Sequence, residues 1–373
     1  MPEPLKNIYS PLFFEQFTAE IKEVLPKFNK QAFINQVFDV HWQNKELKQR
    51  MRHISTVLKD YLPGIYPQQI KTILLFIDQL QRKGIKSGFE YMFLPDFIEQ
   101  YGLENFTASL NAMEQITKFT SCEFAIRPFL LHHQKEVMQQ MLKWSKHAHH
   151  HVRRFSSEGC RPRLPWAMAI PSLKEDPSPI IPVLENLRND ESLFVRKSVA
   201  NNLNDIAKDH PDVVAQLVKS WKGESKGTDW IIKHGCRTLL RKADNTIYGL
   251  FGLSNETSWE IQKLTLNTTR LTMGESLSFS FELVLRSKKE EKLRIEYAIY
   301  YVKANGSLSR KVFHLAAKTY QPNTVYHIKK QQRFQDFTTR KHYPGKHKIG
   351  ILINGKEMAV KEFVLIDKKL SPI

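Results

Sequence analysis

Residues 145–166 gather side chains that are suited to chemistry on a charged polymer. Basic and imidazole side chains fill most of this segment, which also contains one carboxylate, Glu158, and ends with Trp166. On a helix, Glu158 would share a face with Arg154, which lies four residues before it. A lone acid in a basic field is suited to face a cationic target while its surroundings grip a polyanion. The alternative from spacing alone is a plain helix salt bridge between the two residues.

The composition indicates a basic protein with an anionic partner. The chain has 373 residues, with 56 Lys and Arg residues against 38 Asp and Glu residues. This length suggests about two or three domains. The net charge of +18 favours binding to nucleic acid or to an anionic surface. The alternative is a generally basic soluble protein without such a partner.

The cysteines and histidines predict neither a metal site nor a disulfide framework. Cys122, Cys160 and Cys236 are odd in number and lack metal-type spacing. His147 and His151 have the i, i+4 spacing of a ligand pair, but no suitable third ligand accompanies them. We therefore expect no metal and no cofactor. The chain start lacks an apolar signal segment and no apolar run could span a bilayer, so we expect a reducing cytoplasm and no membrane partner.

Residues 1–255 are predicted to form an all-α solenoid of HEAT-like repeats. Apolar residues recur at helical spacing throughout this region, and proline residues separate the helical segments. Beyond residue 104, the pattern predicts helices at 105–118, 121–143, 146–157, 179–188, 192–208, 211–221 and 228–241.

An internal repeat supports this architecture. The Val-Arg-Arg sequence at residues 152–154 resembles Val-Arg-Lys at residues 195–197, 43 positions later. This offset lies within the period of roughly 40–47 residues that HEAT-type helix pairs show. Because the second helices of such pairs line the concave face, the repeated cations would form a basic groove. These cations are Arg153, Arg154, Arg196 and Lys197. The alternative is that they are solvated helix faces beside ordinary core valines.

Residues 256–373 are predicted to form an antiparallel β-sandwich. Seven short stretches of alternating apolar and polar residues are separated by turn sequences such as Asn354-Gly355. The paired cysteines of antibody domains are missing from this sequence. Loops around Arg333-Phe334 and residues 339–343 mix cations with aromatic residues, which would suit contact with DNA. The alternative is a rigid appendage that only stabilises the solenoid.

Three segments resemble the AlkC family of bacterial DNA alkylation repair glycosylases. The most specific begins at His150 and ends with Arg-Pro-Arg-Leu-Pro-Trp at residues 161–166, and the others are residues 123–128 and 190–205. The β-sandwich resembles the immunoglobulin-like domain that many family members carry. The resemblance implies a solenoid that holds duplex DNA and hydrolyses the N-glycosidic bond of cationic bases, chiefly 3-methyladenine and 3-methylcytosine. The related AlkD group does so without turning the damaged nucleotide into a pocket, unlike base-flipping glycosylases.

The resemblance also implies a set of site residues. It makes Glu123, Glu158 and Asp205 the acidic members of the site and Trp166 its aromatic wall. The expected supporting or DNA-binding cations are Arg153, Arg154, Arg161, Arg163, Arg196 and Lys197.

Three of the site residues have a rival role that spacing alone allows. Asp205 could form an ordinary ion pair with Lys208. Glu123 could occupy the first turn of a helix, where acids are favoured. Trp166, which follows Leu164 and a proline, could be a buried anchor.

The expected chemistry follows from the charge of the lesion. A 3-methylated purine is already cationic, so it leaves as a neutral base without being protonated. A fixed carboxylate near C1′ would stabilise the sugar cation and could position a water as general base. No lysine motif indicates Schiff-base chemistry, so we expect a monofunctional, monomeric glycosylase that leaves an abasic site in double-stranded DNA. The alternatives are a non-catalytic HEAT-repeat binder of bent or branched DNA and a protein-binding scaffold.

Overall fold

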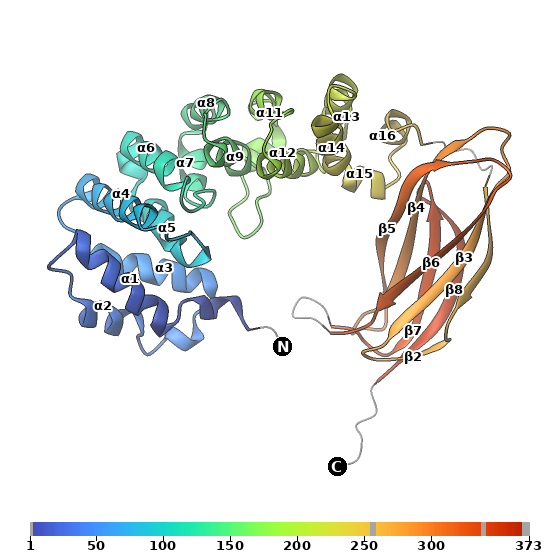
Figure 1. The fold of residues 1–373 in the computed structure, drawn as a ribbon, viewed down its shortest axis with the longest axis horizontal. Helices are drawn as coiled ribbons and strands as arrows, with labels where there is room; N and C mark the ends of the chain where they lie inside the picture. The colour runs from blue at the N-terminus through green and yellow to red at the C-terminus, as the bar shows by residue number, and fades with distance from the viewer. Residues whose placement is uncertain (1–2, 254–258, 337–340, 368–373) are drawn as a thin grey trace, which may run out of the picture. The chain divides into compact units, whose positions relative to one another are not determined.

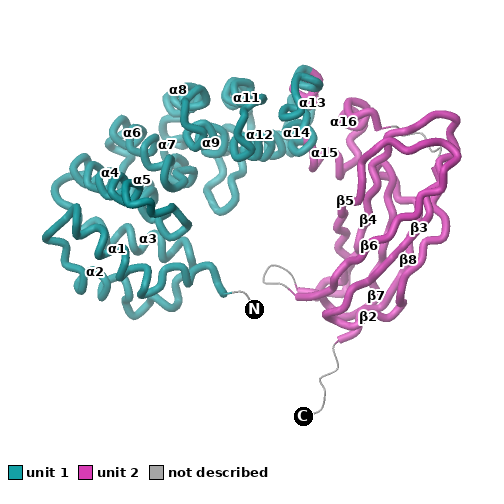
Figure 2. Tube along the Cα trace, viewed as in Figure 1, with its two compact units in different colours: residues 1–214, 220–235 teal, residues 215–219, 236–373 magenta. Residues whose placement is uncertain are grey.

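The computed structural model describes residues 3–253, 259–336 and 341–367. The chain divides into two compact units (Figure 2). Unit 1 contains residues 1–214 and 220–235, and unit 2 contains residues 215–219 and 236–373. The expected domain boundary between residues 255 and 256 lies outside the described residues.

Unit 1 consists of helices arranged in two layers. The inner layer contains α5, α7, α9 and α12, and the outer layer contains α4, α6, α8 and α11 (Figure 1). Within the described ranges, every helix is too short or too polar to cross a bilayer. The elements are η1 (Leu5–Ile8), α1 (Pro11–Val24), α2 (Lys30–Val37), η2 (Trp42–Asn44), α3 (Leu47–Lys59), α4 (Tyr66–Arg82), η3 (Phe89–Tyr91), α5 (Phe93–Tyr101), η4 (Leu103–Asn105), α6 (Phe106–Ile116), α7 (Ile126–His132), α8 (Gln134–Trp144), α9 (His150–Gly159), α10 (Pro171–Glu175), α11 (Ile181–Leu187), α12 (Leu193–Ile206), α13 (Pro211–Trp221), which the two units share, and α14 (Lys226–Gly235).

The internal repeat is visible where α9 packs against α12. Val152 and Val195, which are equivalent in the repeat, are both fully buried. The hydroxyl groups of Ser157 and Ser198 lie 2.7 Å apart, and the Asn202 side chain donates a hydrogen bond of 2.8 Å to the Ser157 carbonyl. These short polar side chains let the two helices approach closely. The predicted all-α architecture of repeated helix pairs is therefore confirmed for this unit.

Two of the predicted helices are wrong in extent, because each divides in the structure. The segment 121–143 splits into α7 and α8 at His133, whose φ of −137° is not helical. The segment 228–241 splits into α14 and α15 at Cys236, whose ψ of 5° ends the helical run. Apolar periodicity continues across both breaks, so the pattern alone could not locate them.

The helix expected at residues 146–157 begins later than predicted, at His150. The imidazole of His149 caps α9, because it accepts a hydrogen bond of 3.3 Å from the backbone N–H of His151. A capping side chain satisfies a donor that the first helical turn leaves unpaired. The helix therefore starts at the cap, and a histidine cap is not among the usual start signals.

Unit 2 combines two helices with a β-sandwich of two sheets. The sheet orders are β1-β3-β6 and β2-β8-β7-β4-β5. The described part of this unit contains eight strands rather than the seven expected, because the short β2 was not recognised. Since β2 pairs parallel with β8, the sandwich is also not wholly antiparallel. The elements are α15 (Arg237–Arg241), α16 (Asn245–Leu250), β1 (Trp259–Leu266), β2 (Arg270–Thr272), β3 (Ser276–Leu285), β4 (Glu291–Val302), β5 (Leu308–Tyr320), β6 (Val325–Arg333), β7 (Gly345–Ile353) and β8 (Lys356–Ile366).

The turn between β7 and β8 packs on α16 and on the turn that joins it to α15. Asn354 and Gly355 both have positive φ angles, 45° and 77°, as a tight hairpin turn requires. A Cβ atom on Gly355 would lie 2.2 Å from the side chain of Ala243 and 3.0 Å from the hydroxyl of Tyr248. Only glycine fits this contact, which joins α16 and the turn before it to the sandwich.

Candidate active site

The last turn of α9 places Glu158 in the interior of unit 1. Val152 and Phe155 are fully buried on the same helix and fix its rotation. Gly159 lets the helix approach its neighbours, since a Cβ atom there would lie 2.9 Å from Met141. Glu158 is consequently only 6% exposed, although it is an acidic residue. A buried carboxylate needs partners close by.

Those partners form a line of alternating charges that joins three carboxylates. Arg154 donates to Glu123 at 2.9 Å and lies 3.8 Å from Glu158. Arg161 donates to Glu158 at 2.5 Å and to Asp205 at 2.8 Å. The structure thus brings together Glu123, Glu158 and Asp205, which are 9%, 6% and 2% exposed. We call these five residues the carboxylate cluster.

The carboxylates differ in how many of their oxygen atoms are engaged. Arg154 contacts both oxygens of Glu123, and Arg161 and Lys208 each take one oxygen of Asp205. Both arginine contacts of Glu158 go to Oε1. Oε2 of Glu158 is therefore the cluster oxygen best placed to meet a water or a cation.

The rival roles of the acidic residues are only partly supported. The pair between Asp205 and Lys208 exists at 2.9 Å, but Lys208 is a half-exposed side chain that a cationic ligand could displace. Glu123 lies in a turn before α7, so the first-turn explanation is wrong. The acidic partners Glu158 and Asp205 raise the pKa of Arg161 above its ordinary value despite burial, which alone would lower it. Arg161 is therefore a permanent cation between two carboxylates.

The loop that follows α9 projects from the inner layer of unit 1 (Figure 1). Trp166 belongs to this loop. Its side chain is 62% exposed, so the interpretation as a buried anchor is wrong. Its φ of 64° is in the left-handed region that non-glycine residues seldom adopt. Lys48 of α3 holds the strained residue by donating a hydrogen bond of 2.7 Å to its carbonyl oxygen. Strain of this kind, when held by surrounding contacts, is typical of functional loops.

Arg127 forms hydrogen bonds with both ends of this loop, and the sequence analysis did not predict this role. Its guanidinium donates to the carbonyl oxygens of Gly159 and Arg161, each at 2.8 Å. It also donates twice to the carbonyl of Met168, at 2.9 Å and 2.6 Å. Arg127 is 1% exposed, and burial lowers its pKa to about 10. The position of Arg127 among apolar residues of a short helix was the sequence feature that could have indicated a buried structural role.

Two of the predicted DNA-binding arginines carry out the same structural task in successive repeats. Arg153 donates to the carbonyl oxygens of residues 147 and 148, which precede α9. Arg196 donates to those of residues 190 and 191, which precede α12. Arg153 also pairs with Asp190 at 2.6 Å. Their guanidinium groups are thus engaged within the protein, and DNA binding by them remains a prediction.

The other predicted cations lie in different surroundings. Arg154 and Arg161 belong to the carboxylate cluster. Arg163 pairs with Asp209 at 2.6 Å on the surface, and Lys197 is exposed on α12. Contact with phosphate is therefore sterically open to Lys197 and Arg163, and it stays a prediction for both.

The histidines serve in caps and local contacts. Nδ1 of His147 accepts a hydrogen bond from the backbone N–H of His149, and Nδ1 of His151 lies 3.1 Å from the carbonyl of Lys118. Within residues 3–253, 259–336 and 341–367, no group of three or more His, Cys, Asp or Glu side chains is arranged to hold a metal ion. All three cysteines are free and buried, and burial raises the pKa of Cys160 to about 12. This thiol therefore has little thiolate character near neutral pH.

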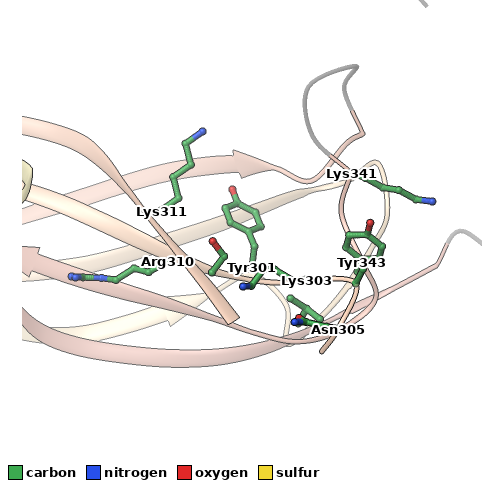
Figure 3. A pocket seen from close by; sticks show the side chains of 10 residues that line it. Tyr301, Lys303, Asn305, Arg310, Lys311, Lys341 and Tyr343 are labelled. Atoms are coloured by element: carbon green, nitrogen blue, oxygen red, sulfur yellow. The ribbon is translucent and has the colours of Figure 1, made fainter. Parts of the chain in front are cut away.

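A second cationic region lies at one end of the sandwich in unit 2. Figure 3 shows Lys303, Arg310, Lys311 and Lys341 around a cavity of about 680 Å³ that Tyr301 and Tyr343 also line. The expected mixture of cations and aromatic residues is only partly correct. Phe334 and His342 are buried in the core, and residues 339 and 340 lie outside the described residues.

The fold and the cluster define a helical-repeat protein with buried, arginine-paired carboxylates, followed by an immunoglobulin-like domain. Residues 104–239 match a family model described as DNA alkylation repair enzyme, and residues 260–367 match one described as YhaZ, C-terminal Ig-like domain. The uncharacterized protein YhaZ of Bacillus subtilis is 44% identical over 353 residues, which cover 94% of this chain and 96% of that protein. The alkylpurine DNA glycosylase AlkC of Pseudomonas fluorescens, solved bound to DNA with an abasic site analog, is 36% identical with a TM-score of 0.92, covering 98% of this chain and 100% of that one. The chain belongs to the AlkC-type family of DNA alkylation repair proteins.

Proposed function

We propose that this protein is a monofunctional DNA glycosylase that removes cationic alkylated bases from duplex DNA and leaves an abasic site. Its substrates would be 3-methyladenine and 3-methylcytosine. The carboxylate cluster, in which two arginines join three buried acids from distant parts of the sequence, is the observation that carries this proposal. The end-to-end similarity to AlkC supports the class of reaction.

The cluster suits a reaction whose leaving group is already charged. As the N-glycosidic bond lengthens, positive charge moves from the base to the sugar. A fixed carboxylate close to C1′ stabilises that charge most strongly in the transition state. We assign this role to Glu158 Oε2 and to Asp205, where the sugar cation would replace Lys208. The same carboxylates can accept a proton from the attacking water.

The other members of the site would position these groups. Arg154 and Arg161 would keep the three acids aligned, because each joins two of them. Trp166 would lie against the deoxyribose or the exposed lesion, where its π face favours a developing cation. An uncharged base is a poor leaving group, so charge itself would provide much of the selectivity.

The cations of unit 2 would add phosphate contacts. Lys303, Arg310 and Lys341 lie around one cavity with Tyr343 (Figure 3), and such groups bind the backbone without reading sequence. Each contact should add roughly 0.9 to the slope of log affinity against log salt. A steep slope is also expected of a non-catalytic DNA binder, whereas a protein scaffold predicts negligible DNA affinity at moderate salt.

The deciding experiment is release of methylated bases from alkylated duplex DNA by the full chain, with abasic sites counted in the same samples. Wild-type protein should release 3-methyladenine and should act on an oligonucleotide with one 3-methylcytosine. The Glu158→Gln, Trp166→Ala double variant should release neither above background while its salt-dependent DNA binding persists. Intact methylated duplexes after incubation with wild-type protein would reduce the protein to a DNA binder. Full activity of the double variant would remove the site assignment.

A further inference from the structure

A cavity in unit 1, separate from the one described in unit 2, adjoins the carboxylate cluster. Its volume is about 430 Å³, and its walls come from η3, from the segment after α6 and from the first turns of α9 and α12. Arg154 contributes to this wall and also pairs with Glu123. Arg154 is therefore shared by the cavity and the carboxylate cluster.

Aromatic side chains dominate the walls of this cavity. Phe89 of η3 and Phe194 of α12 are 51% and 45% exposed, and the other two apolar lining residues, Phe119 and Met92, are buried. Half-exposed rings beside a hollow provide stacking surfaces for a flat heterocycle. Thr120 and Ser121 also line the cavity. A hydroxyl group can donate a hydrogen bond to a ring nitrogen, and that of Ser121 can do so while it accepts one from Arg154.

The electrostatics of the cavity differ from those of the cluster. Among the described lining residues, Arg154 is the one permanently charged side chain, and its guanidinium lies 4.9 Å from the ring of Phe194. His151 also lines the cavity, and burial lowers its pKa, so it is neutral at physiological pH. The cluster thus offers carboxylates to a cation, whereas the cavity offers aromatic faces and a cation. The carboxylate cluster therefore favours a positively charged heterocycle, and the cavity favours a neutral one.

The proposed reaction converts one kind of heterocycle into the other. Water adds to C1′, the electron pair of the N-glycosidic bond remains on the base nitrogen, and the proton lost by water passes to a carboxylate or to solvent. The base loses its positive charge in this step and with it the attraction of the three acids. We propose that the cavity formed by Phe89, Phe194 and Arg154 binds the released neutral purine base. This inference rests on the proposed function, because it assigns a site to the product of that reaction.

Binding of free bases to the full chain without DNA tests the proposal directly. Adenine and 3-methyladenine are the probes, with a permanently cationic dimethylated adenine for comparison, and calorimetry or ligand-detected NMR is the measurement. The neutral bases should bind saturably, and the cationic one at least about tenfold more weakly. Absence of saturable binding, or a preference for the cation, would overturn the proposal.

Variants locate the binding to this cavity. Phe89→Ala combined with Phe194→Ala should weaken adenine binding by about tenfold or more, the usual scale of a lost stacking contact. Phe194→Trp should preserve binding because it keeps an aromatic face. Leu12→Ala is the matched control, since Leu12 is a 68% exposed apolar residue on α1. Equal loss in the control and the double variant would contradict the assignment.

The outcome can be separated from that of the glycosylase assay. A protein that binds adenine at this cavity but releases no base from DNA would refute the proposed function and retain a nucleobase site. An active glycosylase that binds no free base would refute the cavity proposal alone. In an active enzyme, added 3-methyladenine should slow turnover, and it should do so less in the double phenylalanine variant.

Discussion

The guanidinium of Arg127 donates two hydrogen bonds to the carbonyl oxygen of Met168, at 2.9 Å and 2.6 Å. Met168 lies two residues beyond Trp166, so this contact closes the loop on which the exposed tryptophan lies. The remaining bonds of Arg127 go to the beginning of the same loop. The buried side chain of Arg127 therefore fixes the position of the loop that carries the exposed Trp166.

Arg127→Lys should release the loop and lower the free energy of unfolding by about 2 kcal/mol or more. A lysine ammonium cannot reach three separate carbonyl groups, and each buried acceptor left unpaired costs about 1–3 kcal/mol. Urea unfolding and limited proteolysis within residues 160–170 would measure the two effects. Arg163→Lys is the control, because its partly exposed pair with Asp209 should contribute about 1 kcal/mol or less. Equal changes in the two variants would contradict the role of Arg127.

Trp166→Ala should separate activity from stability. The side chain is 62% exposed, so the free energy of unfolding should change by about 0.5 kcal/mol or less. If Trp166 contacts the sugar or the lesion, base release should slow by about tenfold or more, because misplacement of a reacting group is costly. Single-turnover release of 3-methyladenine measures the rate, and Trp166→Phe should recover part of it. An unchanged rate in Trp166→Ala would exclude this residue from the site.

Asp205→Asn and Lys208→Ala distinguish a catalytic acid from a plain ion pair. Loss of the carboxylate should reduce the single-turnover rate by about a hundredfold, as loss of preorganised charge stabilisation usually does. Removal of Lys208 should leave the rate within a few-fold of wild type, because the sugar cation would displace this half-exposed side chain. Should both variants lose activity equally, Asp205 and Lys208 act together as a structural pair.

Asp96 should make the stability of unit 1 depend on pH. Burial raises the pKa of this carboxyl group, although Ser55 and Gln100 donate hydrogen bonds to it. The folded state therefore keeps the proton at a higher pH than the unfolded state, and stability falls as pH rises above about 4. Asp96→Asn cannot titrate, so its free energy of unfolding minus that of wild type should increase between pH of about 4 and 7. Urea unfolding across this range tests the sign, and a decreasing difference would contradict it.

Local patterns in the sequence predicted much of the architecture. Apolar spacing gave most helices of unit 1, and α13 has the bounds that the pattern predicts. Alternation and turn residues gave seven of the eight described strands, whereas β2, with three residues, is too short to alternate visibly. The split helices were missed because apolar periodicity does not stop at His133 or Cys236.

Local sequence patterns predicted less of the candidate site than of the fold. The spacing of Arg154 and Glu158 predicted that they share a helix face, and they lie 3.8 Å apart. Nothing local connects Glu123 with Arg154 or Arg161 with Asp205, because these contacts depend on how α7, α9 and α12 stack. The exposure of Trp166 also required the structure, since a tryptophan after Leu-Pro is as compatible with a core as with a surface.

The fit of Gly355 against Ala243 and Tyr248 bears on how this immunoglobulin-like domain could be exchanged between relatives. A crossover placed just before the first strand would pair a new hairpin with helices that were not shaped for it. A crossover near residue 236, where the longer segment of unit 2 begins, would transfer α15, α16 and the hairpin together. Chimaeras joined there should fold more readily than those joined at the start of the strands.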